Sequence, residues 1–214
     1  MIIDQVAPNP PFALARSRMI DADAHTVMAA VQTANLLDGA TPRLLTWARD
    51  LPNNLAARWH GRAVERLPRS VTFAELSESD TFKVLGEVPD EQFVAGAIGR
   101  FWERDFGWVD FEPEHFATFA EPGYAKTVIG FHAVAREHDR TLLIYESRTV
   151  TTDGDARRRF GRYWKVLQPF VAILLRSALQ SIAREVDRQR SAPVIELRPE
   201  ATTEATPPTI RAAR

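Results

Sequence analysis

The sequence predicts an α+β protein in which a curved antiparallel sheet wraps around a long C-terminal helix. In residues 71–152, apolar side chains recur with the period of two that is typical of strands. Short turns separate these runs, and short connections favour antiparallel pairing. After residue 152 the apolar spacing changes to three or four over about 35 residues, which predicts one long helix.

The N-terminal part predicts a strand and a helix behind a loose lead-in. Residues 1–11 hold three prolines, which indicates an irregular segment. Residues 12–20 interleave apolar side chains with arginines, as a half-exposed strand does. Asp21 or Asp23 then supplies the N-cap of a helix that runs to about residue 37.

One or two short helices are expected in residues 41–61. Pro42 suits the first turn of a helix, and Pro52 marks a place where a helix stops. We expect Trp47 and Trp59 from this segment to face the core.

The region with strand-like spacing predicts two hairpins. Pro89 and Asp90 provide the turn of the first hairpin, and residues 112–123 form a loop or short helix between the two. The order lacks strand–helix–strand alternation, which argues against a parallel sheet. The expected strands are residues 81–88, 93–102, 124–135 and 141–151.

The last helix is expected to start at a cap formed by Thr152 or Asp153 and to end near Arg190. Pro169 should kink it. Since a helix of this length cannot fill the concave face of the sheet everywhere, a cavity is expected between them. We therefore expect one domain over residues 12–190, followed by a disordered tail, residues 191–214, rich in Pro, Thr, Ala and Glu.

Composition narrows the functional classes. Lys and Arg number 27 against 28 Asp and Glu, so no overall charge favours nucleic acid as a partner. The chain has no cysteine, which rules out disulfides and thiolate metal sites. No secretory signal is apparent in the first residues, and the apolar run at residues 169–175 is too short to span a bilayer. We expect a cytoplasmic protein with no stable membrane insertion and at most weak peripheral contact.

Several separated segments, in order, resemble the SRPBCC superfamily, which includes START proteins, polyketide cyclases and birch-pollen allergens. They are GRFW from Gly99, EPGYAKTVIGF from Glu121, YESRTVTTDGDARRRFGRYW from Tyr145 and LLRSALQSIAREVD from Leu174. The resemblance covers roughly residues 10–190 and is closest to bacterial members. It implies the helix-grip fold with a hydrophobic cavity, used in different branches for lipid transport, polyketide cyclisation or dehydration, or hormone binding. No catalytic set of the cyclase members can be placed on this chain.

The last predicted strand leaves two orientations open. Ile144, Glu146, Arg148 and Val150 share one face, and Leu143, Tyr145, Ser147 and Thr149 share the other. If Glu146 and Arg148 point into the cavity, they must pair or bind a polar group of a ligand. If they point outward, they form a surface ion pair.

Aromatic side chains on the expected grip elements supply the candidate cavity wall. On the strand at residues 124–135, we assign the more apolar set to the inner side: Ala125, Thr127, Ile129, Phe131 and Ala133. The strand before it carries small residues that should leave room in front of it: Ala95, Gly96, Ala97 and Gly99. Alternatively, a glycine there marks a bulge. The predicted ligand-binding residues are Phe93, Phe101, Trp102, Ile129, Phe131, Tyr145, Glu146, Arg148, Phe160 and Trp164.

Function is expected to be binding or carriage of a lipid- or polyketide-like hydrophobic molecule. The alternative is an enzyme of the cyclase or dehydratase type, for which Glu146, Tyr145 and His132 are the candidate catalytic residues. The histidines follow no metal-binding spacing, and no P-loop or dinucleotide motif is present, so neither metal nor cofactor is expected.

The start of the last helix is strongly basic, with Arg157, Arg158, Arg159, Arg162 and Lys165 close together. Cations oppose the helix dipole at this end. Two interpretations stay open: a solvated face with local ion pairs, or a basic rim for anionic ligands or lipid headgroups.

Overall fold

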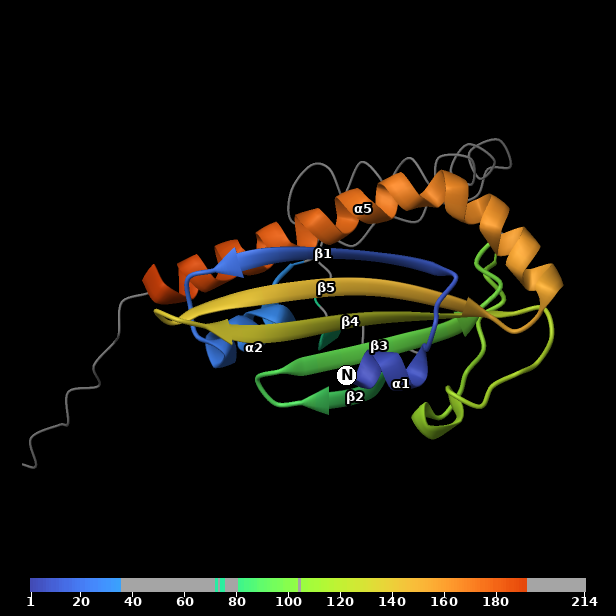
Figure 1. Cartoon of the computed structure of the whole chain (residues 1–214), viewed down its shortest axis with the longest axis horizontal. Helices are drawn as coiled ribbons and strands as arrows, with labels where there is room; N and C mark the ends of the chain where they lie inside the picture. Colours follow the sequence, from blue (N-terminus) through green and yellow to red (C-terminus); the bar gives the residue numbers. More distant parts are fainter. Residues whose placement is uncertain (36–71, 73, 76–80, 104, 192–214) are drawn as a thin grey trace, which may run out of the picture.

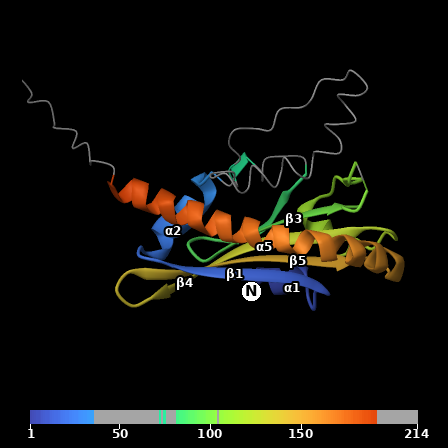
Figure 2. The ribbon, with the colours of Figure 1, turned by 90° about the horizontal axis from the view of Figure 1, so that it is seen from above.

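The computed structural model describes residues 1–35, 72, 74–75, 81–103 and 105–191, and they form the predicted α+β fold. A five-stranded antiparallel sheet with the order β1-β5-β4-β3-β2 curves along the helix α5, Gly154–Ser191 (Figures 1 and 2). This is the helix-grip arrangement, so the resemblance described above is confirmed at the level of the fold. The strands are β1 (Phe12–Ile20), β2 (Lys83–Val88), β3 (Gln92–Gly99), β4 (Ala125–Arg136) and β5 (Arg140–Thr151).

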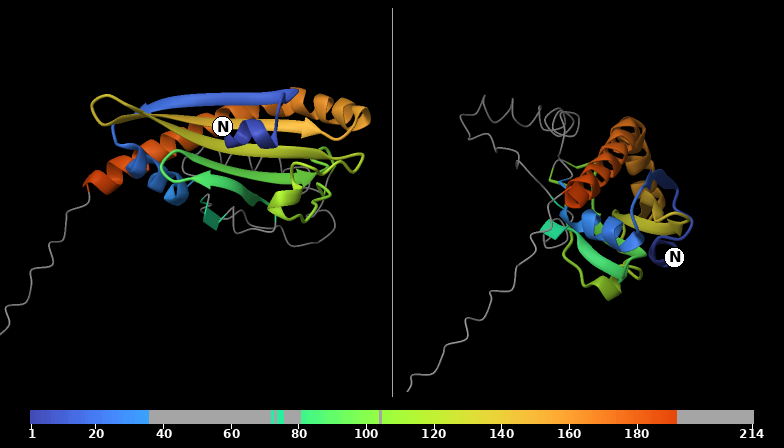
Figure 3. Two further views of the ribbon diagram at one scale, coloured as in Figure 1. Left: turned by 60° about the horizontal axis from the view of Figure 1, so that its bottom comes forward. Right: turned by 90° about the vertical axis from the view of Figure 1, so that its left-hand side faces the viewer.

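The remaining described helices are α1 (Ile2–Val6), α2 (Ala24–Thr33) and the short 3-10 helix η1 (Pro113–His115). Helices α2 and α5 lie on one side of the sheet, which we call the inner face, and α1 lies on the other, the outer face (Figure 3). The Asp23 carboxylate caps α2 by accepting the Thr26 N–H at 2.9 Å. Of the two predicted caps, Asp23 is therefore the one used.

Asp153 caps α5, as predicted. Its carboxylate accepts the N–H groups of Asp155 at 2.6 Å and Ala156 at 2.8 Å, and it also accepts the N–H of Gly123. These bonds, that from Ala156 first, hold the pKa of Asp153 below its usual value. The start of α5 is thereby fixed to the loop before β4. Farther along, α5 changes direction in the half that contains Pro169 (Figure 1).

Strands β4 and β5 form the longest hairpin, closed by a tight turn in which His138 and Asp139 both have positive φ. Strand β1 pairs with β5 from Phe12 opposite Thr149 to Ile20 opposite Thr141. A glycine of β3 was considered as a possible mark of a β-bulge, but the irregularity in register lies in the neighbouring strand β2, between Val84 and Gly86.

Both faces of the central strands are buried, but against different partners. On β3, Phe93, Ala95 and Ala97 pack on the inner side, and Val94 and Ile98 pack on the outer side. Gly96 also faces outward, where an added Cβ would lie 2.6 Å from Leu85 and 2.8 Å from Phe116. The inward assignment of Ala125, Thr127, Ile129, Phe131 and Ala133 on β4 is confirmed.

Two elements differ from the sequence-based expectation. Residues 2–6 form a helix with Ile3 and Ala7 buried against the outer face, where a loose lead-in was expected. Strand β3 ends at Gly99 instead of continuing to Trp102, because the Arg100 N–H turns to the Phe106 carbonyl at 2.6 Å. The helices expected in residues 41–61, with Trp47 and Trp59, and the expected tail beyond residue 191 lie outside the described residues.

Candidate ligand-binding site

A cavity of about 580 Å³ lies between the inner face of the sheet and the N-terminal half of α5. Small-molecule pockets in proteins commonly have volumes of about 300–1,000 Å³, so this cavity can hold a drug-sized molecule. Its described lining is mainly aromatic and aliphatic: Phe82, Phe101, Phe106, Trp108, Thr127, Ser147, Thr149, Phe160, Tyr163, Trp164, Val166, Leu167, Phe170, Val171 and Leu174.

Phe160 is the centre of the aromatic wall. Its ring stacks on Trp164, one helical turn later on α5, with centroids 5.9 Å apart. Phe12 from β1 meets Phe160 edge to face at 4.8 Å, and Phe101 approaches from the segment after β3 at 6.3 Å. Edge-to-face and offset contacts of this kind add to the stabilisation that burial provides. The wall is thus held by three separate parts of the chain.

Three hydroxyl groups lie on the sheet side of the cavity. Thr127 on β4 and Thr149 on β5 are directly opposite each other, and their Oγ1 atoms are 2.9 Å apart. Ser147 precedes Thr149 by two residues and shares its face. A hydroxyl has one donor and two acceptor positions, so the Thr127–Thr149 pair keeps one O–H and further lone pairs after its mutual bond. The sheet side of the largely apolar cavity therefore carries a cluster of hydroxyl groups.

Two small residues of β3 pack on the inner face, Ala95 in the closed core and Ala97 in the cluster around Phe160. Ala95 and Ala97 stand opposite Ile129 and Thr127 on β4 and face inward. At the other end of the sheet the same inner face is closed, because Leu175, Leu179 and Ile182 of α5 pack there together with α2. The cavity is consequently confined to the half of the inner face that lies under the start of α5.

The predicted ligand-binding residues divide into three groups. Phe101, Phe160 and Trp164 line the cavity, and Trp102 packs against Phe160 with ring centroids 6.4 Å apart. The second group lies in the closed core instead of on the cavity wall, since α2 and the C-terminal half of α5 fill that end: Phe93, Ile129, Phe131 and Tyr145. Tyr145 stacks on Phe131 at 4.2 Å, and burial raises its pKa well above the usual value.

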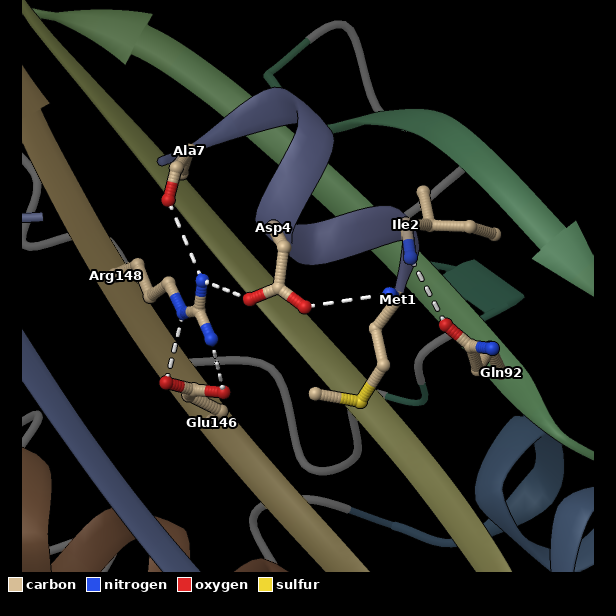
Figure 4. A network of polar contacts seen from close by, with 7 residues as sticks. All are labelled: Met1, Ile2, Asp4, Ala7, Gln92, Glu146 and Arg148. Carbon is tan, nitrogen blue, oxygen red and sulfur yellow. Dashed lines mark hydrogen bonds and ion pairs between the residues drawn. The ribbon is translucent and has the colours of Figure 1, made fainter. Parts of the chain in front are cut away.

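The third group, Glu146 and Arg148, lies on the outer face, so the outward orientation is the one found and these two residues do not line the cavity. Arg148 donates to both carboxylate oxygens of Glu146, at 2.7 and 3.1 Å, to Asp4 at 2.8 Å and to the Ala7 carbonyl at 3.3 Å (Figure 4). The parity of β5 is set by Leu143, Tyr145, Ser147 and Thr149, which face α2, α5 and the cavity. Arg148 therefore fastens α1 to the sheet.

The electrostatics of this network fit a structural role. The hydrogen bond with Glu146 raises the pKa of Arg148, and the hydrogen bond from Arg148 lowers the pKa of Asp4. His132 is on the same outer face, where it and Glu146 border a hollow of about 30 Å³. Such a hollow holds about one or two water molecules. Two of the three candidate catalytic residues are thus separated from the large cavity by the sheet.

The described cavity wall has no carboxylate, histidine or lysine. Within the described ranges there is also no cluster of three or more His, Asp or Glu side chains that could hold a metal ion. What the described wall offers chemically is apolar surface, the hydroxyl groups of Thr127, Ser147 and Thr149, and aromatic rings. Among these rings, Tyr163 carries a hydroxyl and Trp108 and Trp164 carry N–H groups.

Most of the cavity wall was missed by the sequence-based list. Thr127 could have been included, since its strand face was correctly assigned inward. Thr149 and Ser147 depended on the parity of β5, which alternation alone left open. Leu167 follows the apolar spacing of α5, whereas Val166 and Phe170 lie outside that stripe and are exposed at the border of the cavity.

Comparisons with known proteins give likeness in structure only. No family model matches the chain, and no curated protein matches it. A norcoclaurine synthase structure from Thalictrum flavum, in complex with dopamine and hydroxybenzaldehyde, is 12% identical, covers 90% of this chain and 95% of its own, and has a TM-score of 0.40. A protein from Mesorhizobium loti is 13% identical, with coverages of 83% and 98% and a TM-score of 0.37.

An aromatase/cyclase from a Streptomyces species is likewise 13% identical, with coverages of 85% and 96% and a TM-score of 0.33. Because these identities and TM-scores are so low, the fold is assigned from the structure itself, namely from the strand order and the position of α5. The helix-grip fold therefore defines the class of this protein, and its function has to be argued from the cavity.

Among the described helices, α5 alone is long and apolar enough to cross a bilayer. A third of its apolar stretch is buried within the fold, and it packs against β1, β5 and α2 as a core helix does.

Proposed function

We propose that this protein binds and carries a lipid- or polyketide-like hydrophobic small molecule in the cavity between the sheet and α5. The observation that carries the proposal is a cavity of about 580 Å³ whose described wall is largely apolar and aromatic, with the hydroxyl groups of Thr127, Ser147 and Thr149 together on the sheet side. Burying apolar ligand surface contributes about 25 cal/mol per Å². The ligand chemistry that fits is a neutral, largely apolar body, flat enough to lie against Phe160 and Trp164, with one small polar group for Thr127 and Thr149.

A cyclase or dehydratase role has less support. Such chemistry needs an acid and a base within reach of one substrate atom. Glu146 and His132 lie on the outer face, and Tyr145 is buried beside Phe131 with a raised pKa. Turnover of a carbonyl substrate that is lost in both Glu146→Gln and Tyr145→Phe would favour the enzyme over the carrier.

The binding proposal is tested by fluorescence titration with Nile red, a neutral hydrophobic dye. The wild-type protein is expected to bind one dye molecule, and Leu167→Trp, which fills the cavity from α5, is expected to weaken binding at least tenfold. Glu146→Gln on the outer face is the control and should bind as the wild type does. Equal dye binding by the wild type and Leu167→Trp would contradict the proposal.

A further inference from the structure

Next to the cavity, the surface of α5 exposes large apolar side chains. Val166 is 69% exposed, Phe170 and Ile173 are each 40% exposed, and Leu174 is 38% exposed. Scattered apolar residues on a surface are ordinary. These four are spaced by four, three and one residues, so they share one side of the helix. They form an apolar strip along one side of α5.

The same stretch of helix is strongly cationic. Residues 156–184 contain six Arg and one Lys and no Asp or Glu, in a chain whose net charge is −1. Arg158 and Arg159 pair with Asp155 at 2.7 and 3.2 Å, while Arg162 and Lys165 lie exposed one turn before the apolar strip. Positive charge is thus concentrated beside exposed apolar side chains.

We propose that this surface docks the protein on an anionic lipid bilayer. The docking surface consists of Arg162, Lys165, Val166, Phe170 and Ile173. Helices that lie in the membrane interface have this combination: cations that meet lipid headgroups and apolar side chains that enter about 5–10 Å below them. The charge complementarity is between the arginines and lysine of α5 and the headgroups of anionic lipids.

The position of the surface connects it with the cavity. Val166, Phe170 and Leu174 are both exposed and part of the cavity lining, so they form its mouth. Trp108, also exposed and part of the lining, is a residue type that favours the membrane interface. If the protein carries a hydrophobic ligand as proposed above, this position lets the ligand pass between the bilayer and the cavity without crossing water. This part of the inference rests on the proposed function.

A bilayer fits this surface better than nucleic acid does. Phosphate groups of nucleic acid would pair with Arg162 and Lys165 but would leave Ile173 and Phe170 in water. A bilayer accommodates both kinds of side chain at once, which is why we commit to it.

The test is co-sedimentation with vesicles of phosphatidylcholine alone or mixed with phosphatidylglycerol. The wild type is expected to bind the anionic vesicles and to be released by salt. The double variant Arg162→Gln/Lys165→Gln should bind about 30-fold more weakly, since each cation near an anionic surface contributes about a fivefold gain. Ile173→Ser, outside the cavity lining, should weaken binding about tenfold through lost apolar burial.

The matched control is Arg136→Gln/Arg140→Gln in the β4–β5 turn, which removes the same charge from exposed positions away from α5 and should bind like the wild type. Equal losses in the two double variants would overturn the docking surface, as would binding to a DNA duplex without binding to vesicles.

Nile red titration without vesicles separates the two proposals. Dye binding with no vesicle binding refutes docking alone, and vesicle binding with no dye binding refutes the carrier and its loading from the bilayer.

Discussion

The paired hydroxyl groups of Thr127 and Thr149 give the cavity a directional contact at one point of an apolar wall. Thr149 is 2% exposed, so a polar group of a ligand that reaches it is shielded from water. A hydrogen bond in such a place contributes about 0.5–1.5 kcal/mol, and leaving a buried partner unpaired costs more. We therefore expect Thr149 to select among ligands of similar size.

Thr149→Val keeps the shape of the side chain and removes the hydroxyl. We expect the wild type to bind 1-naphthol about 2- to 10-fold more tightly than naphthalene, and the variant to lose this preference. Displacement of Nile red measures both affinities. Thr118→Val, in the loop after η1, is the control and should keep the preference. A preference that persists in Thr149→Val would show that the hydroxyl pair does not contact the ligand.

Carboxylates with lowered pKa values make the fold sensitive to acid. The Ala156 N–H lowers the pKa of Asp153, and the Thr26 N–H lowers that of Asp23. Since the folded pKa lies below the unfolded value of 3.8, each contribution is complete above that value and is lost as the pH falls through the folded pKa.

We therefore expect stability to fall between about pH 5 and about pH 2, with a smaller fall in Asp153→Asn because that variant has already lost the ionised cap. Urea unfolding at a series of pH values measures this. Asp139→Asn, in the β4–β5 turn, is the comparison and should follow the wild type. If Asp153→Asn showed the full acid dependence, the cap would not be a source of it.

Residue parity on β5 shows where inference from the sequence stops. Alternation places Glu146 with Arg148 and Tyr145 with Ser147, but it does not say which pair faces inward. The deciding contacts are remote: Arg148 bonds Asp4, which is 144 positions away in the chain. Tertiary contacts therefore decide which face of β5 points inward. For this reason the cavity residues of β5 could not be chosen from the sequence.

At the scale of elements, the strands and the long helix were predictable because each carries a strong local signal. The alternation of apolar and polar side chains predicts the bounds of β1. The carboxylates of Asp23 and Asp153 mark the starts of α2 and α5. Helix α1 was not predictable, since a helix of five residues is unstable on its own and forms here through packing against the outer face. The early end of β3 depends on a backbone bond within the following loop, from Arg100 to Phe106, which the alternation of side chains does not reveal.

Helix α1 is expected to contribute to stability mainly through Ile3, which is buried against Gly130 and Val94. Ile3→Ala should lower the free energy of unfolding by about 2 kcal/mol or more, as large-to-small changes at buried positions do. Met19→Ala, at an exposed position of β1, should change it by less than about 0.5 kcal/mol. Urea unfolding compares the two. Similar small effects would mean that α1 is not held on the sheet.

At the scale of the whole molecule, the two faces of the sheet are packed differently. The outer side is closed by α1, by the Asp4–Arg148–Glu146 network and by the apolar cluster around Phe116. The inner side is closed only at the end where α2 packs, within the described residues, and has the cavity at the other end. A cavity was expected from a long helix across a curved sheet, but its place follows from the packing of α2 and the C-terminal half of α5, which fill the other end of the inner face.

Methyl NMR spectroscopy during titration with Nile red tests the central claim most directly, because side-chain methyl groups report on each face of the sheet separately. We predict shifts at the methyl groups of Thr127, Thr149, Leu167 and Val171, around the cavity, and unchanged signals from Ile3, Val94 and Val128 on the outer face. Shifts confined to the outer-face methyl groups, or the absence of any shift at saturating dye, would contradict a hydrophobic ligand site between the sheet and α5.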